Sequence, residues 1–90
     1  MAVKLVTYDL NREVVRPNIT KKLKEAWPTW AMLSESCYAI ETDMSHDDVL
    51  DTLSPLIDGD DAIYVFDLKK PYAGAGPQSV IDWLEEQLTY

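Results

Sequence analysis

The pattern of apolar and polar positions predicts four β-strands in this chain of 90 residues. Between Val3 and Tyr8 the side chains alternate with a period of two, as in a strand, and Asp9 ends the run because aspartate favours turns. Residues 30–33 and 36–42 predict two further short strands around a tight turn at residues 34–35. Residues 62–68 are rich in β-branched and aromatic side chains, which favour a fourth strand.

Apolar residues at helical spacing predict three helices. The first begins at Pro17, whose missing N–H costs nothing in a first turn, and ends before Pro28. The second opens at Ser45, with Asp48 three residues on as in a capping box, and we expect it to end at Gly59. The third runs from about residue 79 to residue 88. The apolar stripe of the first helix consists of Ile19, Leu23, Ala26 and Trp27.

The elements follow one another as strand, helix, strand, strand, helix, strand, helix. The first six form the split βαβ pattern of the ferredoxin-like fold. We therefore predict an α+β protein, a ferredoxin-like βαββαβ unit with an antiparallel four-stranded sheet in spatial order 4-1-3-2 and an extra C-terminal helix. The length leaves room for one domain, which covers residues 1–90.

Both faces of the predicted sheet carry apolar side chains. In the fourth strand, Ile63 and Val65 point to one face. Tyr64 and Phe66 point to the other face. Two helices can cover only one face, and a monomer rarely leaves a large contiguous apolar surface open. We therefore expect a homodimer formed through the second face, unless the C-terminal helix closes that face within its own chain. The covering residues would then be Val80, Trp83 and Leu84.

Charge is abundant and unevenly distributed. Eight Lys and Arg against 16 Asp and Glu give a net charge of −8, which argues against a protein whose affinity for nucleic acid rests on neutralising phosphates. From Glu41 to Asp61 the chain carries acidic residues and no Lys or Arg. Any contact with RNA should therefore use the basic segment after the first strand, unless that segment is simply the solvent face of a helix. Its residues are Arg12, Arg16, Lys21, Lys22 and Lys24.

The remaining composition bears on the location of the protein and on the metal sites it could form. Cys37 is the single cysteine, so no internal disulfide can form and a reducing, cytoplasmic location is expected. No apolar run is long enough to span a membrane, and the first ten residues lack the pattern of a signal peptide. One Cys and one His cannot supply the usual ligands of a zinc site.

The segment VKLVTYDL, residues 3–10, is an apolar strand that ends in Tyr-Asp before a polar loop and a Lys-rich helix. With the split βαβ pattern and the length, it resembles the small ferredoxin-like proteins of the CRISPR-associated adaptation-nuclease group and the related VapD toxins. The likeness is closer to bacterial and phage proteins of the SinR family, through TYDL, a Trp in the second strand, Glu41-Thr42-Asp43 and Trp83-Leu84. The resemblance to the nuclease group implies that Asp9 is catalytic and binds a divalent metal across a dimer axis. The chain differs from that group in its acidity and in ending with a predicted helix, where the group exchanges a fifth strand between subunits.

The predicted strand order also brings together carboxylates that could form a metal site. The end of the first strand lies beside the start of the fourth, which brings Asp9 to the same sheet edge as Asp60 and Asp61. Carboxylates and waters are the ligands that Mg²⁺ prefers, and such a site could orient a water for attack on a phosphodiester. The alternative is that Asp9 caps a turn while Asp60 and Asp61 are ordinary surface turn residues.

Two functions are therefore open. One is a dimeric binding or regulatory module without catalysis, which docks a protein partner through its acidic surface. The other, implied by the resemblance, is a Mg²⁺-dependent endoribonuclease that uses Asp9 at a dimer interface and holds RNA with Arg12, Arg16 and Lys21. The chemistry of the residues favours the first.

Overall fold

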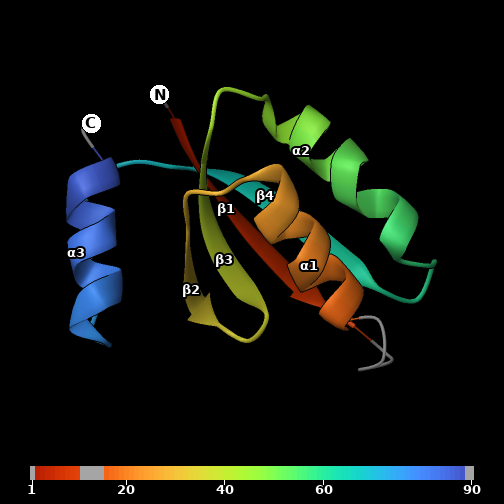
Figure 1. Ribbon diagram of the computed structural model, residues 1–90, viewed down its shortest axis with the longest axis horizontal. Helices are drawn as coiled ribbons and strands as arrows, with labels where there is room; N and C mark the ends of the chain where they lie inside the picture. The colour runs from red at the N-terminus through yellow and green to blue at the C-terminus, as the bar shows by residue number, and fades with distance from the viewer. Residues whose placement is uncertain (1, 11–15, 89–90) are drawn as a thin grey trace.

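The computed structural model describes residues 2–10 and 16–88, and these residues build one sheet and three helices (Figure 1). In chain order the elements are β1 (Ala2–Asp9), α1 (Arg16–Ala26), β2 (Trp30–Ser34), β3 (Cys37–Thr42), α2 (His46–Leu53), the 3₁₀ turn η2 (Ser54–Leu56), β4 (Ala62–Leu68) and α3 (Gln78–Gln87). The α+β class and the element order predicted from the sequence are confirmed. No helix among the described residues is long and apolar enough to cross a membrane.

The four strands form an open antiparallel sheet in the order β2-β3-β1-β4. This is the predicted order, read from the opposite edge. Every residue of β4 pairs with β1, from Leu68 opposite Val3 to Ala62 opposite Asp9. The end of β1 therefore lies beside the start of β4, as predicted.

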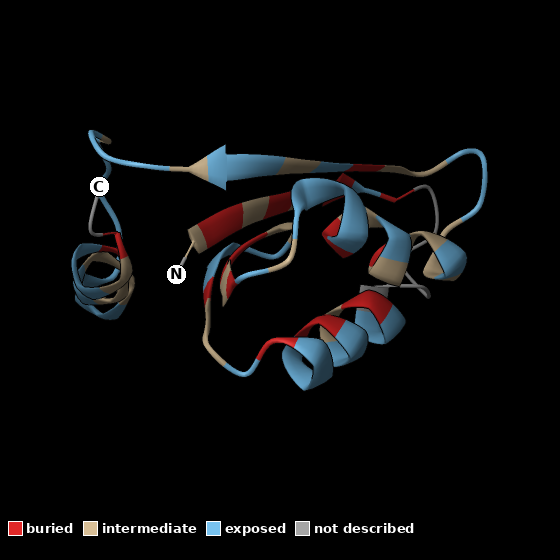
Figure 2. Cartoon of the chain, turned by 90° about the horizontal axis from the view of Figure 1, so that it is seen from above, coloured by how far each residue is buried: buried red, intermediate tan, exposed pale blue. Residues whose placement is uncertain are grey.

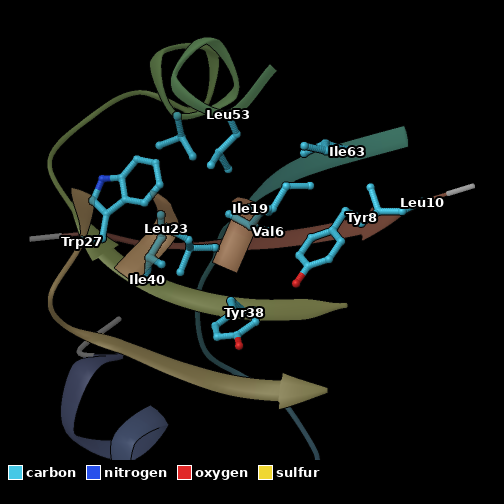
Figure 3. Close-up of a cluster of buried hydrophobic side chains, with 11 residues drawn as sticks. Val6, Tyr8, Leu10, Ile19, Leu23, Trp27, Tyr38, Ile40, Leu53 and Ile63 are labelled. Carbon is cyan, nitrogen blue, oxygen red and sulfur yellow. The ribbon is translucent and has the colours of Figure 1, made fainter. Parts of the chain in front are cut away.

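The main core lies between the sheet and the two helices α1 and α2 (Figure 3). Ile19 and Leu23 of α1, and Trp27 directly after it, point into this core and are almost fully buried. They meet Val6 of β1 and Leu53 of α2. Burying a side chain of this size contributes roughly 1.5–3 kcal/mol, so this layer accounts for much of the stability. Ala26, which the sequence pattern placed in the same stripe, is exposed, because it lies on the outer side of the last turn.

The opposite face of the sheet has a smaller core of its own. There α3 lies beside β2, on the side of the sheet away from α1 and α2 (Figures 1 and 2), and its apolar side chains reach β1 and β3. Leu84 and Leu88 are buried against Val3 and Ala39. The conditional prediction that Val80, Trp83 and Leu84 cover this face within the same chain is confirmed. The covering is partial, because Tyr64 and Phe66 of β4 stay exposed.

The second helix ends earlier than the sequence indicated. We expected it to run to Gly59, but α2 ends at Leu53 and continues only as the single turn η2. Pro55 explains the difference, since it has no N–H with which to extend the helical ladder. Gly59 does not adopt the left-handed conformation of a helix-ending glycine.

Candidate binding face and the predicted carboxylate site

The half of the sheet face that α3 leaves open presents large apolar side chains to solvent. The register places Phe66 beside Leu5, and Tyr64 beside Thr7, in rows that continue to Ala39 and Cys37 of β3. Tyr64 is 60% exposed and Phe66 is 55% exposed, although both are strand residues of a kind usually buried. We call this surface, formed by Leu5, Thr7, Tyr64 and Phe66, the open half-face.

A groove borders the open half-face where the chain returns from β4 to α3. Its volume is about 310 Å³. Its walls come from Leu5 and Leu68 of the sheet, from residues 72–77 of the connecting segment, and from Val80 and Leu84 of α3. The lining is predominantly apolar and holds no acidic or basic side chain, so it is suited to packing rather than to acid–base chemistry.

The connecting segment is fastened to α3 by one carboxylate. Glu85 accepts hydrogen bonds from the Lys70 Nζ at 3.0 Å and from the Tyr72 hydroxyl at 3.1 Å. These two bonds, with Lys70 first in importance, hold the pKa of the Glu85 carboxyl below its usual value. Burial, together with the bond to Glu85, raises the pKa of Tyr72. The cluster of Lys70, Tyr72 and Glu85 was not predicted, because residues 69–77 carry no periodic pattern.

Asp9 lies where the sequence predicted, at the exposed end of β1 opposite Ala62. Its position in the strand puts it on the same side of the sheet as Thr7 and Tyr64. Asp61 immediately precedes Ala62, so the backbone brings Asp9 near the turn that contains Asp60 and Asp61.

The Asp61 carboxylate forms a hydrogen bond within its own turn. Asp61 Oδ2 accepts the backbone N–H of Asp58 at 3.2 Å, and the Asp61 N–H bonds the Asp58 carbonyl at 3.1 Å. Within residues 2–10 and 16–88, no three His, Cys, Asp or Glu side chains gather into a group that could hold a metal ion. Asp9 and Asp61 are thus neighbours in the fold without forming a ready-made site for Mg²⁺.

The predicted basic segment is described only in part. Arg12 lies outside the described residues, and Arg16 begins α1. Lys21 and Lys22 are exposed on α1, as the solvent face of an amphipathic helix would be. Lys24 instead lies over the Trp30 ring, with Nζ 4.5 Å from its centroid, in a cation–π contact.

The single cysteine and the single histidine both occupy ordinary environments. Burial raises the pKa of the Cys37 thiol, and a hydrogen bond with Thr7 opposes this only in part. A raised pKa disfavours the thiolate, which is the reactive form. His46 is exposed at the start of α2, with Nε2 3.8 Å from an oxygen of Asp47.

One charged pair lies within the sheet and was not predicted. Lys4 is only 8% exposed and forms an ion pair with Asp67 across β1 and β4. The hydrogen bond from Lys4 is the main reason why the pKa of Asp67 is lowered. The alternation along β1 already indicated that Lys4 faces the core, since it points to the same side of the sheet as the buried Val6 and Tyr8.

No protein-family model matches this chain, and no curated protein matches it significantly.

Proposed function

We propose that this chain is a small dimeric binding or regulatory module with a ferredoxin-like βαββαβ core, and that it works without catalysis. The observation that carries the proposal is the open half-face, where Tyr64 and Phe66 are more than half exposed. Exposed aromatic side chains beside an apolar groove are typical of a protein-binding surface. The protein partner, a second copy or a different protein, buries this surface in a reducing cytoplasm.

The expected homodimer uses the open half-face of both copies. At micromolar concentration we expect light scattering to give twice the chain mass of 10.3 kDa. Phe66→Ser should shift the protein to the mass of one chain, because it removes an aromatic side chain from the centre of the contact.

Met32→Ser is the matched control for this experiment. Met32 is 48% exposed, close to the exposure of Phe66, but it pairs with Tyr38 and so belongs to the other side of the sheet. The control should remain dimeric. A wild-type mass of one chain would contradict the dimer, and equal effects of the two substitutions would contradict the surface assigned to it.

A second candidate, a Mg²⁺-dependent endoribonuclease, is favoured by the position of Asp9. Asp9 is exposed on the side of the sheet that the proposed dimer would bring together. This candidate also follows from the resemblance to the CRISPR-associated, VapD and SinR proteins, with Asp60 and Asp61 as further metal ligands and Arg12, Arg16 and Lys21 along the RNA.

Cleavage of RNA with Mg²⁺ or Mn²⁺ decides between the two candidates. If the chain is a nuclease, Asp9→Ala and chelation of the metal should both abolish cleavage, while the melting temperature changes little because exposed residues contribute about 0.5 kcal/mol or less. Asp43→Ala, another exposed carboxylate, is the matched control. We expect no cleavage by the wild type, as a binding module requires.

A further inference from the structure

The outer edge of the sheet at β4 is unusually open for an edge strand. Among the described residues β4 pairs with β1 alone, and in Figure 2 it is the outermost, largely exposed ribbon of the sheet. Edge strands are commonly protected by Lys, Pro or a bulge. The sequence of β4, AIYVFDL, contains no Lys, Pro or Gly, and its pairing with β1 has no irregularity. Its one charge, Asp67, is turned to Lys4 of the neighbouring strand.

The opposite edge shows the protection that β4 lacks. The other edge strand, β2, has a register shift between Met32 and Ser34 that interrupts its ladder. It also lies beside α3 (Figure 1). Val80 and Trp83 of α3 line one side of a hollow, and Trp30, Ala31 and Met32 of β2 line the other. The two edges of the sheet therefore differ in how well they are protected, and only β4 offers a regular, extended backbone for pairing.

The helix beside β4 is acidic. α2 packs on β4, and its exposed Asp47, Asp48 and Asp51 belong to the stretch between Glu41 and Asp61 that contains no Lys or Arg. The open edge is thus flanked by apolar aromatic residues on one side of the sheet and by an acidic helix on the other. A second copy of this chain does not suit this edge, because pairing β4 with its own copy would bring two acidic helices together.

We propose that β4 accepts an extended, basic segment of a partner protein as an additional strand. The segment would pair with the β4 backbone, place apolar side chains beside Tyr64 and Phe66, and place Lys or Arg on the side of α2. Pairing through the main chain provides affinity, and the charge of α2 provides the preference for a basic sequence. The inference rests on the proposed role as a binding module, and it leaves the dimer intact, since the added strand lies in the plane of the sheet beyond β4.

The probe is a fluorescent synthetic peptide of about ten residues in which lysine alternates with valine, long enough to span one strand. In an antiparallel ladder every second amide of β4 faces away from β1. We expect these outward amides to exchange rapidly with solvent in the free protein and to become protected when the peptide binds. The same peptide with alternate backbone nitrogens methylated keeps its charge but cannot form the ladder, and it should not bind.

Two charge variants of equal size locate the electrostatic contribution. Asp47→Asn with Asp51→Asn, on α2, should weaken binding of the lysine–valine peptide about fivefold, the effect expected for two exposed ion pairs. The matched control, Asp82→Asn with Glu86→Gln on α3, changes the net charge equally and should alter the affinity less than about twofold. Circular dichroism checks that both variants keep the fold.

Three results would overturn the proposal: unprotected β4 amides in the complex, equal binding of the methylated peptide, or equal weakening by the two charge variants. Protection of the outward β4 amides in the peptide-free dimer would also overturn it, by showing that a second copy occupies the edge. Light scattering on the same samples keeps the two proposals separate. A dimer that does not bind the peptide contradicts only the proposed added strand. A monomer that binds the peptide contradicts only the proposed dimer.

Discussion

Glu85 ties the connecting segment to the last helix. Its carboxylate receives Lys70 and Tyr72 from the connecting segment, while the helix that carries it buries Leu84 and Leu88 against the sheet. Both bonds are partly exposed to solvent, so each contributes modestly. Together they fix the course of residues 70–72 along α3, and this course forms the wall of the groove beside the open half-face.

The lowered pKa of Glu85 predicts how this attachment depends on pH. A carboxyl whose pKa is lower in the folded state stabilises that state above its unfolded pKa, and the contribution is lost as the pH falls through the folded-state value. Hydrogen-exchange protection of α3 should therefore decrease on acidification. Glu85→Gln should show lower protection at neutral pH and a weaker dependence on pH.

Glu86→Gln is the control, because Glu86 is an exposed neighbour on the same helix. It should keep both the protection and the pH dependence of the wild type. If Glu85→Gln and the wild type lose protection of α3 in parallel as the pH falls, the attachment does not depend on this carboxylate.

At the scale of elements, α2 depends on the hydrogen bond that caps its N-terminus. Ser45 adopts an extended backbone, and its hydroxyl accepts the Asp48 N–H at 3.1 Å. The predicted N-cap is thus confirmed. With only eight residues, α2 cannot be stable alone and needs both this cap and the burial of Val49 and Leu53.

Ser45→Ala should lower the free energy of unfolding by about 1 kcal/mol, because the capping hydrogen bond is lost. Ser79→Ala, an exposed position in the first turn of α3, is the control and should change it by less than about 0.5 kcal/mol. Urea unfolding measures both. A Ser45 variant as stable as the control would mean that the cap contributes nothing measurable.

Elements with a strong local pattern could be predicted from the sequence. The bounds of β4 agree with the prediction to the residue, because Asp60 and Asp61 precede a run of β-branched and aromatic residues and Lys69 follows Leu68. The first helix is bracketed by Pro17 and Pro28 in the same way. The end of α2 was predicted too late, at Gly59, because that prediction took no account of Pro55, and a proline within the run restricts the helix more strongly than a glycine beyond it.

The candidate site could be predicted only as far as strand pairing determines it. The nearness of Asp9 to residues 60–61 follows from the order of the strands and was predicted. The use of the Asp61 carboxylate within its own turn depends on local backbone geometry, which no residue pattern specifies. The division of the second face into a covered and an open half depends on the course of residues 69–77, which have no periodicity to analyse.

At the scale of the whole molecule, the net charge of −8 opposes self-association. If the apolar open half-face drives the dimer, added salt should screen this repulsion and strengthen the dimer. Raising the NaCl concentration from about 0.05 to about 0.5 M shortens the screening length from more than 10 Å to only a few ångströms. We expect the dissociation constant of the dimer, measured by sedimentation, to fall over this range.

Salt should have the opposite effect on the lysine–valine peptide, whose attraction to α2 is electrostatic. The two dependences have opposite signs in one buffer series, so they separate apolar from ionic association in the same molecule. A dimer that weakens with salt would show that ion pairs rather than the open half-face hold it together.

The lone cysteine lies in the same row of the sheet as Thr7 and Tyr64, and its thiol is half-buried with a raised pKa. The chain therefore carries a built-in chemical reporter at the border of its open surface. Because burial raises the pKa of the Cys37 thiol, we expect its alkylation to be slow in the free protein, and a partner that covers the surface should slow it further. A single reagent thus follows the occupancy of the face in an unlabelled, unmodified chain, with no second thiol to confuse the signal.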